Sequence, residues 1–176
     1  MAKRESGKGR SVQNDDRLFT LEVSLFSGPM TEEFAKANKA VSHTIQIRGD
    51  QTLEELHDAI FAAFDRSDEH LYEYQIGGKR PMDPKARRYG LGDGHEGSGL
   101  DSPDLTGDVT DTTIGSLGLK VNDMFGYWFD FDDDWWHQIS VMSIEHKAPR
   151  GQYPKVTKRV GKNPPQHVDW DEEDDQ

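Results

Sequence analysis

The stretch that decides the fold is Thr52-Leu-Glu-Glu-Leu-His-Asp-Ala-Ile-Phe-Ala-Ala-Phe64. Its first four residues form a capping box, in which the Thr52 hydroxyl can accept from the Glu55 amide while the Glu55 carboxylate reaches back. The apolar residues that follow recur every three or four positions and make one stripe, formed by Leu53, Leu56, Ile60, Ala63 and Phe64. This spacing predicts a helix of about three turns with one buried face.

Alternating apolar residues on both sides of this helix predict the strands that it covers. Residues 18–26 and 41–47 alternate before the helix, and residues 72–76 follow it. An aromatic stretch at 125–131 and an apolar stretch at 139–145 predict two further strands. Alternation with a period of two is typical of a strand that has one buried face. The predicted order of the main elements is therefore β-β-α-β-β-β.

This order favours an α+β fold in which a mixed β-sheet packs on one main helix, because each element has a single apolar side to bury. It is the order of a β-grasp, or ubiquitin-like, fold, and we predict that arrangement. A short helix at 31–40 and a helical turn at 114–119 complete the set. Residues 79–111 are polar and rich in glycine. They show neither the apolar spacing of a helix nor the alternation of a strand, so we expect a long loop there.

Composition divides the chain into one domain and two tails. Of the 176 residues, 33% are hydrophobic and 31% are charged, which is lean for a globular protein unless the apolar residues are concentrated. They are concentrated in residues 17–167, which we predict to be a single domain. The basic segment 1–16 and the acidic segment 168–176 are predicted to be disordered tails that aid solubility.

Several classes of protein are excluded or disfavoured by simple counts. The chain contains no cysteine, which excludes a disulfide framework, a thiolate zinc site and a cysteine nucleophile. No apolar run approaches the roughly 20 residues that span a bilayer, and no signal peptide is recognisable, so we expect a cytoplasmic protein without membrane contact. The net charge of −12 disfavours broad binding to nucleic acid.

The most unusual segment is Tyr127-Trp-Phe-Asp-Phe-Asp-Asp-Asp-Trp-Trp-His137. If Asp130, Asp133 and His137 converge at a hairpin end, they can hold a divalent cation such as Mg²⁺, Mn²⁺ or Ca²⁺. The alternative is an aspartate-rich turn whose side chains bond nearby backbone amides. Because only one histidine accompanies the aspartates, the amide-bonded turn is favoured. The candidate ligand-binding residues, including one histidine before the third strand, are His70, Tyr127, Asp130, Asp133, Trp135 and His137.

Three separate segments resemble the plasmid pRiA4b Orf3-like family. They are Thr52-Leu-Glu-Glu-Leu-His-Asp-Ala-Ile, His70-Leu-Tyr-Glu-Tyr-Gln-Ile-Gly and Phe129-Asp-Phe-Asp-Asp-Asp-Trp-Trp-His-Gln-Ile, and the resemblance spans residues 18–166. It places the family's hairpin motif on Tyr127, Asp130, Asp133, Trp135 and His137. The family usually has glycine where this chain has Asp132, which implies an unusual φ at that position.

The resemblance implies an association with mobile genetic elements but no established activity. Our leading hypothesis is a non-enzymatic binding or adaptor module with a protein partner, since an edge strand and an open sheet face suit recognition. The second is a metal-binding or small-ligand-binding protein, or a hydrolase-like enzyme, that uses Asp130, Asp133 and His137. The third is a nucleic-acid-associated protein with a basic N-terminal tail, which the overall charge makes the weakest.

Overall fold

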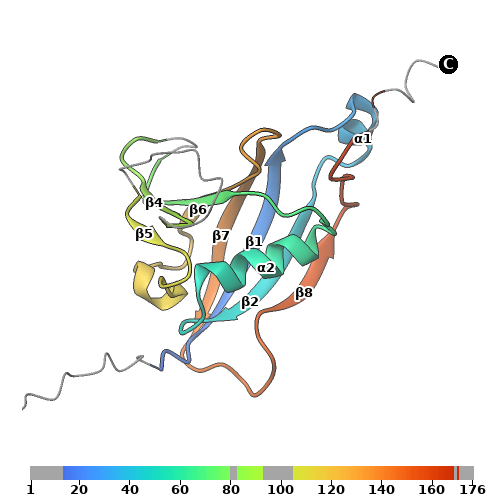
Figure 1. Ribbon diagram of the computed structural model, residues 1–176. Helices are drawn as coiled ribbons and strands as arrows, with labels where there is room; N and C mark the ends of the chain where they lie inside the picture. The colour runs from blue at the N-terminus through green and yellow to red at the C-terminus, as the bar shows by residue number, and fades with distance from the viewer. Residues whose placement is uncertain (1–13, 80–82, 93–104, 169, 171–176) are drawn as a thin grey trace, which may run out of the picture.

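The computed structural model describes residues 14–79, 83–92, 105–168 and 170, and in this part of the chain it forms one eight-stranded sheet (Figure 1). The strands in chain order are β1 (Leu18–Ser27), β2 (Ser42–Arg48), β3 (Tyr72–Ile76), β4 (Arg87–Gly90), β5 (Gly107–Asp108), β6 (Met124–Phe129), β7 (Trp135–Glu145) and β8 (Lys155–Val160). The helices are α1 (Glu32–Ala37), α2 (Leu53–Ala63) and a 3₁₀ helix, η1 (Ile114–Leu117).

The strand order across the sheet is β5-β4-β3-β6-β7-β1-β2-β8. The β4–β5 pair is parallel and each of the other neighbouring pairs is antiparallel, so the sheet is mixed. The predicted α+β class is confirmed. The β-grasp order with one main helix is not confirmed, because β4, β5 and β8 extend the sheet beyond the strands that periodicity predicted.

The expected long loop at 79–111 is corrected by the structure, which places β4 and β5 within its described parts. Tyr89 on β4 is buried and pairs with Tyr74 on β3, which fixes this segment to the sheet. The predicted tails fall mostly outside the described residues. Near the start of the described chain, the Asp15 carbonyl accepts from the Asp50 amide at 2.8 Å and joins this segment to the turn after β2.

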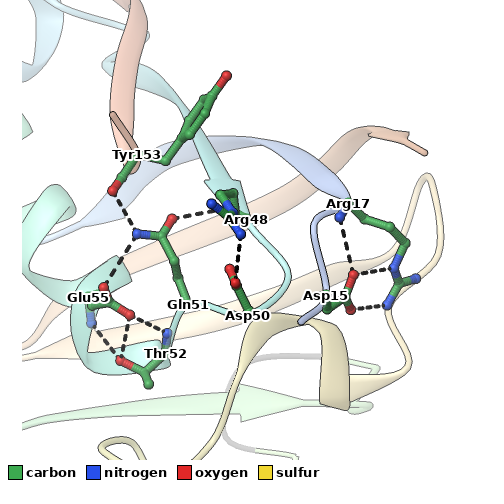
Figure 2. A network of polar contacts seen from close by, with 8 residues as sticks. All are labelled: Asp15, Arg17, Arg48, Asp50, Gln51, Thr52, Glu55 and Tyr153. Carbon is green, nitrogen blue, oxygen red and sulfur yellow. Dashed lines mark hydrogen bonds and ion pairs between the residues drawn. The ribbon is translucent and has the colours of Figure 1, made fainter. Parts of the chain in front are cut away.

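Helix α2 begins as the sequence predicts. The Glu55 amide donates to the Thr52 hydroxyl at 3.2 Å, and the Thr52 amide donates to the Glu55 carboxylate at 2.7 Å, which completes the capping box. Figure 2 shows how this end of the helix is joined to its surroundings: the Gln51 side-chain amide donates to the Tyr153 carbonyl at 2.6 Å. The helix start is therefore tied to the connection between β7 and β8.

Helix α2 lies across one face of the sheet and covers it (Figure 1). The side chains of the sheet that point to this side build the core, among them Phe19, Leu21, Ile45, Tyr74, Phe125 and Ile139. The opposite face, which we call the open face, follows from the strand register. One row of paired residues crosses it from β8 to β4 and consists of Val160, Ser42, Ser24, Gln138, Gly126, Gln75 and Arg88.

No helix in the described residues is long and apolar enough to cross a membrane.

Candidate functional site

A buried polar cluster lies on the covered face, where β6 and β7 meet α2 and the segment that follows the helix. Tyr127 is fully buried, and its hydroxyl lies 2.5 Å from Nδ1 of His57. The other ring nitrogen of His57 lies 2.6 Å from the carboxylate of Glu69. Because a carboxylate only accepts, the Nε2–H of His57 donates to Glu69, and the Tyr127 hydroxyl is the hydrogen-bond partner of Nδ1. Burial raises the pKa of Tyr127 well above its ordinary value, so the phenol stays protonated.

Arg66 and His137 form the second half of this cluster. Arg66 is 8% exposed, and its Nη2 donates to Nε2 of His137 at 2.7 Å. Since arginine has no acceptor, His137 is neutral and its Nδ1–H donates to the Tyr127 carbonyl at 3.1 Å. Burial and the nearby Arg66 charge hold the pKa of His137 well below its ordinary value. Both ring nitrogens of His137 therefore have structural partners.

The Arg66 guanidinium is enclosed by aromatic rings. Its Cζ atom lies 5.0 Å from the ring centre of Phe64, 4.7 Å from that of Phe129 and 5.3 Å from that of Trp135. Burial lowers the pKa of Arg66 to about 10, so the side chain is still a cation at neutral pH. Ring faces attract a cation, which partly offsets the loss of its water shell. The Trp135 ring in turn packs so close to Gly28 that a Cβ there would lie 2.1 Å from it.

The aspartate-rich hairpin end is an amide-bonded turn. Asp130 is buried, and its Oδ1 accepts from the backbone amides of Asp132 at 3.1 Å and Asp133 at 3.2 Å. Its other oxygen lies 3.5 Å from Nε2 of His70. Asp130 and Asp134 have φ values of 61° and 57°, a left-handed conformation that aspartate adopts more readily than most residues. The unusual φ implied at Asp132 is not there but at these two neighbours.

The structure brings five of the six predicted site residues together in the buried polar cluster and the hairpin turn beside it. They are His70, Tyr127, Asp130, Trp135 and His137. The Asp133 side chain is exposed, and the hydrogen bond described above uses its backbone amide. In the described ranges, no group of three or more histidine, aspartate and glutamate side chains could hold a metal ion. The proposed set of Asp130, Asp133 and His137 therefore does not converge.

Three residues of the cluster were missed by the sequence analysis: His57, Arg66 and Glu69. The sequence held a signal for His57, because this residue lies beside the apolar stripe of α2. The structure shows that its side chain is buried. A polar ring on a buried helix face needs hydrogen-bond partners, which points to neighbours in the sheet. Arg66 and Glu69 follow the helix in a polar segment, where exposed charges are the ordinary outcome, so their sequence context gives no such signal.

A second candidate site is a groove of about 520 Å³ on the open face. Gly126 lies on its floor between Gln75 and Gln138, its paired neighbours on β3 and β7. Phe26, Met124 and Trp136 also line the groove. A Cβ at Gly126 would meet Gln75 at 3.7 Å, an ordinary contact, so a side chain there would extend into the groove.

The apolar side chains around this groove are unusually exposed. Phe26 is 68% exposed and Met124 is 58% exposed, and Met142 on the same face is 52% exposed. Beside the groove, the rings of Trp128 and Trp136 are stacked, with centroids 4.8 Å apart and planes 8° apart. The open face therefore carries large apolar groups that the described part of the chain leaves in contact with solvent.

Comparisons with known proteins agree with this fold. Residues 32–171 match the family of the plasmid pRiA4b ORF-3-like protein, and the chain belongs to this family. The chain is also similar to the crystal structure of a protein of unknown function, MM3350 from Methanosarcina mazei Go1. That likeness has a TM-score of 0.60 and 22% sequence identity, and it covers 81% of this chain and 69% of the other. At this identity it shows a shared fold. No curated protein matches the chain.

Proposed function

We propose that this member of the plasmid pRiA4b ORF-3-like family is a non-enzymatic binding module that holds an apolar segment of a protein partner in the open-face groove. The observation that carries the proposal is the set of exposed apolar side chains around Gly126, a glycine in the middle of the sheet with open space above it. Contiguous exposed apolar patches on soluble proteins commonly mark interaction sites. Exposed aromatic and methionine side chains are also enriched at protein interfaces.

The chemistry of the groove suits a peptide segment. Phe26 and Trp136 offer ring faces to an apolar side chain, and Met124 is flexible enough to adapt its shape to that side chain. Gln138 borders the same floor, and a side-chain amide can both donate to and accept from a peptide backbone. Apolar anchors surrounded by a few polar groups are the usual anatomy of such sites.

The buried cluster supports a structural role better than a hydrolase-like one. His137 is buried, both its ring nitrogens are bonded, and its pKa is lowered, so it is poorly placed to act as a general base on a substrate. One carboxylate oxygen of Asp130 accepts hydrogen bonds from two backbone amides of its own turn. These contacts fix the hairpin between β6 and β7, whose outward side chains line the groove.

The test is a peptide-display selection on the full chain, followed by affinity measurements on two glycine variants. Gly126→Leu fills the groove, while Gly151→Leu makes the same change at an exposed loop residue near Tyr153. Selected peptides should contain aromatic or large aliphatic anchors. Their affinity should fall at least about tenfold in Gly126→Leu, equivalent to about 1.4 kcal/mol, and should be unchanged in Gly151→Leu. Equal affinity for both variants would place the binding site elsewhere.

A further inference from the structure

Strand β8 is the outermost strand at one side of the sheet and is strongly basic. Among the described residues it pairs with β2 on one side, and the strand order of the sheet ends with it. Residues 145–163 contain six lysines and arginines and one acid, a net charge of +5 with histidine neutral, whereas the whole chain carries −12. Five of the six residues of β8 itself are exposed. Residues 145–163 therefore form a basic strip along one edge of the sheet in a protein that is acidic as a whole.

The charges on this strip are largely uncompensated within the described residues. Lys147, Arg150, Lys158 and Lys162 form no ion pair there. The Lys155 ammonium lies 5.6 Å from the ring centre of Tyr153, and a ring face leaves its charge intact. Like charges gathered along one edge repel one another, and an acidic ligand would relieve that repulsion.

The strand register shows which way the lysines point. Lys155 pairs with Gln46 and Lys158 pairs with Thr44, and a shift in register at Thr157 separates the two pairs. Gln46 and Thr44 are two residues apart on β2, so they share one face, and the two lysines share it with them. An added strand with an acid at every second residue could therefore present its carboxylates to both lysines.

We propose that β8 accepts an extended acidic segment of a protein partner as a further strand of the sheet. The unpaired backbone of an edge strand offers donors and acceptors to such a segment, and the lysines select for negative charge. A second copy pairing through β8 would place lysine near lysine, which is destabilising. A nucleic acid lacks the alternating backbone donors and acceptors and would be repelled by the rest of the chain. This site is independent of the groove.

The experiment measures binding of fluorescent peptides to the full chain by anisotropy. The probe is a short peptide in which glutamate alternates with valine or threonine. Two matched probes carry glutamine for glutamate, or N-methyl groups on alternate amides. The test variant is Lys155→Glu with Lys158→Glu, and the control is Lys85→Glu with Lys120→Glu. The control makes the same charge change at exposed residues that precede β4 and β6.

The proposal predicts that the β8 variant binds the acidic peptide at least about tenfold more weakly, while the control changes affinity less than about twofold. The glutamine and N-methylated peptides should each lose at least about tenfold against the native chain. An N-methylated peptide that binds as well as its parent would show charge attraction without strand addition and overturn the proposal. So would tighter binding of oligothymidine, or a dimer that the β8 variant abolishes. The Gly126→Leu variant should bind the acidic peptide normally, which separates this outcome from that of the groove.

Discussion

The two faces of the sheet use side chains in opposite ways. On the covered face, polar groups are buried and hydrogen-bonded in pairs, Tyr127 with His57 and Arg66 with His137. On the open face, apolar groups such as Phe26 and Met124 are exposed. Buried polar groups generally need hydrogen-bond partners within the protein, so we infer that the covered face serves to stabilise the fold. Exposed apolar groups add little to stability, so the open face is available for contact with a partner.

The largest expected effect comes from truncating the core under α2. Phe64 is 2% exposed and its ring packs edge-on against His43 and His137. Phe64→Ala should therefore lower the free energy of unfolding by about 3–5 kcal/mol. Met142→Ala on the open face should change it by about 0.5 kcal/mol or less. Urea denaturation followed by circular dichroism measures both, and similar losses would contradict the division between the two faces.

The hairpin turn should respond to the loss of one acceptor. Asp130→Ala removes the oxygen that two backbone amides donate to and replaces a residue at φ 61°, so it should cost about 1–3 kcal/mol. Asp130→Asn keeps an acceptor and tolerates the left-handed conformation, and should cost clearly less. Asp133→Asn should cost about 0.5 kcal/mol or less, because its side chain is exposed. Thermal unfolding ranks the three, and a reversed order would refute the amide-bonded turn.

Stability should fall as the solution becomes mildly acidic. Burial lowers the folded-state pKa values of His43 and His137 below their ordinary value of 6.5. Between that value and the folded pKa, the unfolded chain binds more protons than the native one, so stability is lost as pH falls below about 6.5. Each histidine can contribute a slope of up to about 1.4 kcal/mol per pH unit.

Denaturation curves at a series of pH values check this slope. His137→Gln should flatten it, whatever that substitution does to stability at pH 8. The exposed His146→Gln is the matched control and should leave the slope as it is. A slope that is the same in all three proteins would mean that His137 does not titrate differently in the folded and unfolded states.

The sequence predicted the parts of the fold that have a strong local signal. The capping box and apolar stripe of α2 were found correctly, because both depend on residues within one helix. Strands β4 and β5 were missed since they are four and two residues long, too short to show a period. Strand β8 was missed because it is an exposed edge, so most of its side chains are polar. Neighbour order in the sheet depends on contacts between distant segments, which local patterns do not encode.

The candidate site was predictable to a similar degree. The crowded aspartates and aromatic residues of the hairpin drew attention to Tyr127, Asp130 and His137, and these do lie together. Their partners His57 and Arg66 come from a different part of the chain, and only the folded structure brings them near. The groove was equally hidden, because its floor is a glycine whose surroundings come from three strands.

The most direct test of the separation between the two faces is one double variant measured in two ways. Phe26→Ser with Met124→Ser removes two exposed apolar groups from the groove. Its free energy of unfolding should stay within about 1 kcal/mol of the native value, because neither side chain is buried. Its affinity for the peptides selected on the native chain should fall at least about tenfold. Unchanged affinity, or a loss of several kcal/mol in stability, would contradict the account.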